Sequence, residues 1–339
     1  MMILVIIAQA NAQSTKRFTI VQRDDARRVD VVVDGKPFTS YIYPDDIMKP
    51  VLYPLRTVDG AFVTRGWPLD PRPGERVDHP HHVGMWLNYG DVNGLDFWNN
   101  STDIAPDKRH RYGTIRHREV KKVQSGNDKG VLEVVADWQK PDGTNLLREE
   151  TRYIFSGTGK TLSIERITTL TALGEDVALH DNKEGLLGIR LARELEHPSE
   201  KPEVFTDASG KATTVAVLNN EGVSGQYHSS EGKVGNDVWG TRARWVNLTG
   251  TIGGSPVSLV VLDHPRNVGF PTYWHARGYG LFAANPLGQK EFSKGKEVLD
   301  YKLPAGKSVT FRYKVLLHSG SHLTQAEVEK EYSRFSKTK

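Results

Sequence analysis

The stretch Ser308-Val309-Thr310-Phe311-Arg312-Tyr313-Lys314-Val315-Leu316-Leu317 alternates apolar and polar residues almost without interruption. Successive side chains of a strand point to opposite faces, so a period of two predicts a half-buried β-strand. The same reasoning predicts further strands at 29–33, 131–138, 150–155, 162–167 and 257–262. Turn signals such as Asp34-Gly35 separate the runs. The pattern predicts an all-β protein built as one large antiparallel β-sandwich.

One long segment departs from this alternation. Residues 66–111 carry Pro, His, Asn, Asp and Trp in place of alternating apolar residues. A stretch of that length without strands is usually functional or disordered, and its aromatic content favours an ordered, loop-rich insertion folded back on the sandwich. No linker divides residues 13–339, so we expect a single domain.

The C-terminus carries the signals of one helix. Thr324 and Glu327 have the spacing of a capping box, and an apolar stripe at helical spacing follows and ends at Phe335. These residues predict a helix over 323–337.

Composition excludes several classes of protein. The 339 residues contain no Cys, which rules out disulfides, thiolate metal sites and a Cys nucleophile. The net charge is +4, with Lys and Arg interspersed among Asp and Glu, so the concentrated basic face of a nucleic-acid-binding protein is missing. There is also no Gly-x-Ser-x-Gly elbow, P-loop or Rossmann glycine pattern.

The first residues have the pattern of a secretory signal peptide. Ile3 to Ala8 is a short apolar run, and Ala10-Asn11-Ala12 fits the small-x-small cleavage pattern. We therefore expect residues 1–12 to be a signal peptide and the mature protein to be periplasmic or secreted. The run is too short to span a bilayer, which needs about 20 apolar residues, so no integral membrane association is expected.

A histidine cluster is the strongest candidate for a functional site. It lies in Asp78-His79-Pro80-His81-His82-Val83-Gly84-Met85-Trp86, which holds three of the 12 histidines. Imidazole titrates near neutrality and also binds metals. In an extended strand His79 and His81 would share one face. We predict that His81 and His82 act as acid or base, or hydrogen-bond a polar substrate. No spacing here is diagnostic of a metal, so no cofactor is expected, although a divalent metal remains an alternative.

Other polar and aromatic segments supply candidate partners for this cluster. Glu184 is predicted as the complementary carboxylate, and His264 and His275 as distant catalytic histidines. Aromatic faces combined with amide, carboxylate and guanidinium groups suit sugar rings, which have apolar faces and polar edges. The predicted substrate-binding residues are Trp86, Asp96, Arg190, Arg242, Trp239, Tyr273 and Trp274. The alternative is that the aromatics pack the insertion onto the sandwich and that the arginines face solvent. For the inward-drawn Arg190, Glu184 and Asp181 are the predicted partners.

Taken together, these segments resemble a bacterial family filed under the label "methane oxygenase PmoA" and also as a domain of unknown function. The resemblance covers roughly residues 30–318 and is carried by 78–86, 90–98, 183–190, Trp239-Gly240 with Arg242 and Trp245, Asp263-His264-Pro265, 271–275 and 280–286. A methane monooxygenase subunit is an integral membrane protein, which this chain does not resemble, so we treat the label as a misnomer. The resemblance implies a supersandwich like that of galactose mutarotases and related lyases and hydrolases.

These observations predict an exported carbohydrate-active protein, an enzyme that cleaves or isomerises a sugar by His/Glu acid–base chemistry. The expected partner is a small carbohydrate or an oligosaccharide. Two alternatives stay open: a non-catalytic carbohydrate-binding module, and a metal-dependent oxidase or hydrolase.

Overall fold

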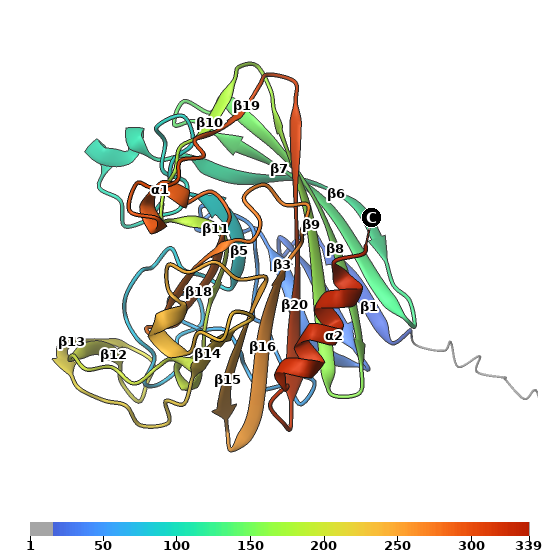
Figure 1. The fold of residues 1–339 in the computed structure, drawn as a ribbon, viewed down its shortest axis with the longest axis vertical. Helices are drawn as coiled ribbons and strands as arrows, with labels where there is room; N and C mark the ends of the chain where they lie inside the picture. The colour runs from blue at the N-terminus through green and yellow to red at the C-terminus, as the bar shows by residue number, and fades with distance from the viewer. Residues whose placement is uncertain (1–15, 339) are drawn as a thin grey trace, which may run out of the picture.

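The computed structural model describes residues 16–338, and its framework is two eight-stranded sheets packed face to face (Figure 1). The predicted signal peptide, residues 1–12, lies outside the described residues. Neighbouring strands of both sheets pair antiparallel. The predicted all-β antiparallel sandwich is therefore confirmed.

The first sheet draws its strands from three distant parts of the chain. In spatial order they are β1 (Phe18–Arg23), β2 (Arg28–Val33), β3 (Lys36–Ile42), β4 (Val51–Leu52), β5 (Met85–Tyr89), β11 (Gly185–Arg190), β18 (Leu281–Asn285) and β17 (Tyr273–Arg277). Because β5, β11, β18 and β17 are neighbours, segments around residues 86, 188 and 275 lie on one surface.

The second sheet contains the longer strands. In spatial order they are β14 (Gln226–Ser229), β15 (Trp245–Ile252), β16 (Ser255–Asp263), β20 (Ser308–Ser319), β9 (Thr161–Ala172), β8 (Asn145–Thr158), β7 (Lys129–Gln139) and β6 (Thr114–Gln124). The six strands predicted from period-two alternation or apolar runs are β2, β7, β8, β9, β16 and β20, and all six are present.

Smaller elements complete the fold. They are the strand pairs β10 (Val177–Leu179) with β19 (Tyr301–Leu303) and β12 (Glu203–Thr206) with β13 (Ala212–Val217), the helices α1 (Gln289–Phe292) and α2 (Gln325–Phe335), and the 3-10 turns η1 (Pro106–Arg111), η2 (Arg193–Leu195) and η3 (Gly235–Val238). Among the described residues, no helix combines the length and apolarity that crossing a bilayer requires.

The main core lies between the sheets. The apolar residues of β20 that were predicted to share a face, from Val309 to Leu317, all pack into it. The first sheet contributes residues such as Leu87 and Ile189. Burial of this apolar surface is the main source of stability.

One prediction about strands was wrong. The insertion 66–111 is mostly irregular, as expected, but it contains β5 in the middle of the first sheet. All five residues of β5 are buried, so no apolar–polar alternation marks the strand. Near the predicted Trp239 and Arg242, η3 and Gly240, at a φ of 69°, turn the chain before β15 begins.

The C-terminal helix forms as predicted. Thr324 Oγ1 accepts a hydrogen bond from the backbone N of Glu327 at 3.3 Å. The Glu327 side chain in turn accepts from the backbone N of Thr324, which completes the capping box. The apolar stripe of α2 then packs on the outer face of the second sheet against Trp245 and Leu262. The outer face of the first sheet is instead covered by the irregular segments, which bury Trp86 and Trp98 there.

Candidate functional site

The outer face of the first sheet forms the floor of the candidate site. Trp86 pairs in register with Gly188, Gly188 with Ala283, and Ala283 with His275, so the four residues form a row across β5, β11, β18 and β17. A Cβ added to Gly188 would lie 2.5 Å from the Trp86 ring. Gly188 therefore lets the indole lie flat across β11.

A tight turn brings the histidines onto this floor. His79 has a φ of 46°, and the backbone N of His82 donates to His79 O at 2.9 Å. The turn overrides the extended geometry in which His79 and His81 would share a face, so that prediction was wrong. Positive φ at a residue other than glycine is costly and clusters at functional sites.

The turn produces a stack of four rings that runs from the surface inward. Tyr279 and His79 have ring centroids 5.0 Å apart with planes at 4°, and His79 and His82 are 4.8 Å apart at 3°. Trp86 continues the stack, 5.3 Å from His82. His79 is thus held between two rings, and its side chain is 41% exposed.

Asp78 anchors the turn. Its Oδ1 accepts from Arg65 Nη1 and from Arg190 Nη2, each at 2.5 Å, and its Oδ2 lies 3.0 Å from His79 Nδ1. Burial alone would raise the pKa of the Asp78 carboxyl, but Arg190, the His79 hydrogen bond and Arg65 bring this pKa well below its usual range. The partner of Arg190 is therefore Asp78, not Glu184 or Asp181 as predicted.

The three clustered histidines differ in chemistry. Burial lowers the pKa of both His81 and His82 well below the usual range, so these rings stay neutral. His82 is buried, with Nδ1 3.4 Å from Arg190 Nη1. His79 has Nδ1 on the Asp78 carboxylate, which leaves Nε2 for a ligand. His79 is thus the imidazole best placed to exchange a proton.

Glu184 and His275 are two further predicted catalytic residues, and they come from β11's entrance and from β17 of the same sheet. Burial raises the pKa of Glu184, although Lys183 Nζ, 3.6 Å away, acts in the opposite direction. His275 is buried, and burial, followed by Arg277, lowers its pKa to about 3. Among the described residues, His275 Nδ1 has no hydrogen-bond partner.

A hollow opens beside the ring stack. Its volume is about 490 Å³, in the range of small-molecule pockets. Its lining includes His197, Glu203, Asn236, Trp239, Arg277 and Tyr279. The Trp239 side chain is 42% exposed, and the guanidinium of Arg277 lies 5.1 Å from its ring. We call this space the Tyr279 hollow, because Tyr279 joins it to His79.

A second, smaller hollow of about 200 Å³ lies on the other side of the histidine turn and is lined by Lys49, Trp67 and His81, among others. Lys49 Nζ donates to His81 O at 2.6 Å, and burial lowers the pKa of this amine to about 7. The charge of Asp96 opposes that shift. Asp96 itself accepts from the backbone and side chain of Asn99, and burial raises its pKa.

Not every predicted site residue reaches this area. Arg242 binds Pro271 O at 2.7 Å and the Glu297 carboxylate, and it stacks on Tyr273 at 4.3 Å, at the other end of β17. Trp274 faces the core and donates to Ala243 O at 3.0 Å, because alternate residues of β17 point inward.

His264 also lies away from the candidate site. It follows β16 of the second sheet, with its ring 5.1 Å from that of Phe335, the last residue of α2. The structure therefore does not join His264 or Trp274 to the other candidates. The predicted residues that it does bring to the outer face of the first sheet are His81, His82, Trp86, Asp96, Glu184, Arg190, Trp239, His275 and, at the far end of β17, Tyr273.

Several members of the site were missed from the sequence. Asp78 directly precedes His79, and a carboxylate beside an imidazole was the available signal. Arg277 continues the outer-face alternation of Tyr273 and His275 along β17. Nothing in the sequence around Arg65 indicated a role in the site, since only the folded chain brings Arg65 to Asp78.

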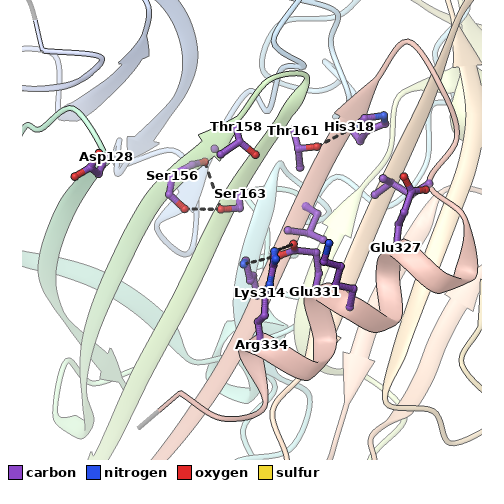
Figure 2. Close-up of a pocket in the computed structure, with 14 residues that line it drawn as sticks. Asp128, Ser156, Thr158, Thr161, Ser163, Lys314, His318, Glu327, Glu331 and Arg334 are labelled. Atoms are coloured by element: carbon purple, nitrogen blue, oxygen red, sulfur yellow. Dashed lines mark hydrogen bonds and ion pairs between the residues drawn. The ribbon is translucent and has the colours of Figure 1, made fainter.

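A third hollow, of about 420 Å³, lies between α2 and the second sheet (Figure 2). Its polar groups satisfy one another: Ser156 Oγ and Ser163 Oγ are 2.7 Å apart, and Thr161 Oγ1 is 2.8 Å from His318 Nδ1. It therefore lacks the unpartnered polar atoms of the first sheet's outer face.

Within residues 16–338, no group of three or more His, Asp or Glu side chains is arranged to hold a metal ion.

Similar solved structures include enzymes of sugar metabolism. They are an α-galactosidase from Geobacillus stearothermophilus (10% identity, TM-score 0.38, 90% of this chain and 41% of that one), galactose 1-epimerase from Lactobacillus acidophilus (11%, 0.32, 89% and 98%) and a putative aldose 1-epimerase from Escherichia coli (12%, 0.33, 90% and 99%). The chain spans about two fifths of the α-galactosidases. Similarities this weak assign no activity to the chain.

The sequence comparisons give the family. No curated protein matches the chain. A family model described as "Family of unknown function (DUF6807)" matches residues 28–333, so the predicted membership of a family of unknown function is confirmed. That description assigns no activity. The chain belongs to this family, DUF6807.

Proposed function

We propose that this protein is a carbohydrate-active enzyme that binds a sugar in the Tyr279 hollow and acts on it by proton transfer. The observation that carries the proposal is the Asp78–His79 pair: Nδ1 of His79 lies 3.0 Å from a carboxylate fixed by two arginines. Such a carboxylate sets the tautomer of the imidazole and leaves Nε2 free to take or give a proton. His79 thereby takes the role first predicted for His81 and His82.

Glu184 is the complementary group in this proposal. Burial raises its pKa, which favours the protonated form of a carboxyl that gives up its proton during the reaction. Glu184 directly precedes β11, the strand that ends at Arg190, a partner of Asp78.

The hollow itself supports a sugar as the ligand. Trp239 presents an exposed indole, and amide, carboxylate and guanidinium groups surround it. A sugar ring needs both kinds of surface, an apolar one for its C–H face and a polar one for its hydroxyl groups. The volume of the Tyr279 hollow, about 490 Å³, is sufficient for one or two sugar units.

The proposal is tested with the full chain and a panel of mono- and disaccharides. Anomeric exchange is followed by NMR and bond cleavage by the release of reducing ends. We expect binding and turnover of at least one sugar. Binding without turnover would select the non-catalytic module, and no binding across the panel would contradict both.

We also propose that the protein is exported, on the basis of the apolar run and the Ala10-Asn11-Ala12 pattern. N-terminal sequencing of the protein expressed in a bacterial host is expected to show a mature chain that begins at Gln13. An unprocessed chain retained in the cytoplasm would contradict export.

A further inference from the structure

The side chain of Arg277 has an unusual setting at the wall of the Tyr279 hollow. It is the last residue of β17, and its guanidinium lies 5.1 Å from the Trp239 ring and 5.8 Å from the Tyr279 ring. When a guanidinium stacks on an aromatic ring, its planar face makes the contact. The N–H groups at the edge of the guanidinium can then donate hydrogen bonds to another partner.

Arg277 differs from the buried or half-buried arginines around it. Each of the neighbouring arginines Arg65, Arg76, Arg190 and Arg193 is paired with an aspartate or glutamate. Within residues 16–338, the guanidinium of Arg277 has no hydrogen bond or ion pair, and only the two rings contact it as a cation. A guanidinium held in place with its donors free is prepared to bind an anion.

The charges around Arg277 leave this cation uncompensated. Glu203 in the wall of the hollow is already bound to Arg76 Nη1 at 2.7 Å. Exposed Glu200 and Lys201 on the rim are sequence neighbours of opposite charge. His275, two residues before Arg277 on the same face of β17, has a buried Nδ1 without a partner among the described residues. Among the described residues that line the hollow, neither glutamate forms an ion pair with Arg277.

We propose that the sugar bound in the Tyr279 hollow carries a carboxylate, as uronic acids do, and that Arg277 binds it through two parallel hydrogen bonds. This inference rests on the function proposed above and names its substrate class. A carboxylate is planar and presents two oxygens that match the guanidinium fork. The rings of Trp239 and Tyr279 lie beside that fork and offer apolar surface to the sugar ring.

The test compares sugars that differ only at C6. Galacturonate is paired with galactose and glucuronate with glucose, and dissociation constants are measured by calorimetry on the full chain. Because a hydrogen bond to a charged group contributes about 1.5–3 kcal/mol, we expect the uronate of one pair to bind at least about tenfold more tightly. The R277Q variant should lose that preference. R277K, which keeps the charge but not the fork, should keep part of it.

A matched control separates the local contact from general charge. Lys36 on β3 is an exposed cation that does not line the hollow, so K36Q should leave the preference unchanged. Circular dichroism and thermal unfolding of R277Q show whether the fold is intact. A wild-type protein that binds neutral and acidic sugars equally, or a folded R277Q that keeps the preference, would overturn this inference and leave the proposed function standing. No binding of any sugar would overturn both.

Discussion

The carboxylate of Asp78 lies 2.5 Å from Nη2 of Arg190 and so joins the histidine-rich turn to the end of β11, 112 positions later in the chain. The same carboxylate oxygen accepts from Arg65, and its partner oxygen orients His79. Arg65 and Arg190 are buried, and both guanidinium groups form an ion pair with the Asp78 carboxylate. The position of His79 therefore depends on this network of four side chains.

Asp78→Asn should destabilise the protein strongly. The substitution removes the carboxylate that forms the ion pairs with Arg65 and Arg190, and breaking a buried ion pair in this way costs about 3–5 kcal/mol. Urea unfolding followed by tryptophan fluorescence measures the loss. The control is Asp34→Asn, which breaks the exposed pair with Arg17 at 3.1 Å and should cost about 1 kcal/mol or less. Equal losses in the two variants would show that the Asp78 network contributes little.

Gly188→Ala tests the close approach of Trp86 to β11. A Cβ at this position would lie 2.5 Å from the indole, and the strand and ring would have to move apart. Overpacking of this kind costs about 1–3 kcal/mol. Gly174→Ala is the control, since nothing lies within 4 Å of its Cβ, and it should change stability by about 0.5 kcal/mol or less. A Gly188→Ala protein as stable as Gly174→Ala would mean that the ring is free to shift.

Lys49→Met tests the buried amine. The pKa of Lys49 is lowered to about 7 in the folded state, against about 10.4 in the unfolded chain. Between these values the unfolded state binds one more proton, so this residue makes stability rise with pH by up to about 1.4 kcal/mol per unit. Unfolding free energies measured from pH 7 to 10 should show a flatter rise for Lys49→Met than for wild type.

The comparison for this pH effect is Lys36→Met, at an exposed position of β3. That variant should keep the wild-type slope. Identical slopes in all three proteins would mean that Lys49 stays protonated when buried.

Much of the fold could be predicted from the sequence because strands such as β20 are buried on only one face. β20 has one face in the core and one face partly exposed, so its residues alternate and the strand is readable. β5 is buried on both faces, and its sequence Met-Trp-Leu-Asn-Tyr has no period to detect. The strand most important for positioning Trp86 was therefore the one that periodicity could not find.

The site was only partly predictable for a different reason. The histidine cluster could be recognised from the sequence. The positive φ of His79, however, places its ring against that of His82, which the sequence did not predict. Trp274 and His275 are adjacent in sequence, yet they lie on opposite faces of β17. His264 lies near Phe335 because β16 belongs to the other sheet. Such placements depend on strand order, which local sequence does not contain.

The most direct test of the account is the effect of His79→Gln on turnover and on binding of the same sugar. Because the proposed role of His79 is proton transfer, kcat should fall by about 10²–10⁴ while the dissociation constant changes little. His110→Gln, an exposed histidine in η1, should leave both unchanged. A His79→Gln protein with wild-type kcat would contradict the assignment of the Asp78–His79 pair as the reacting centre.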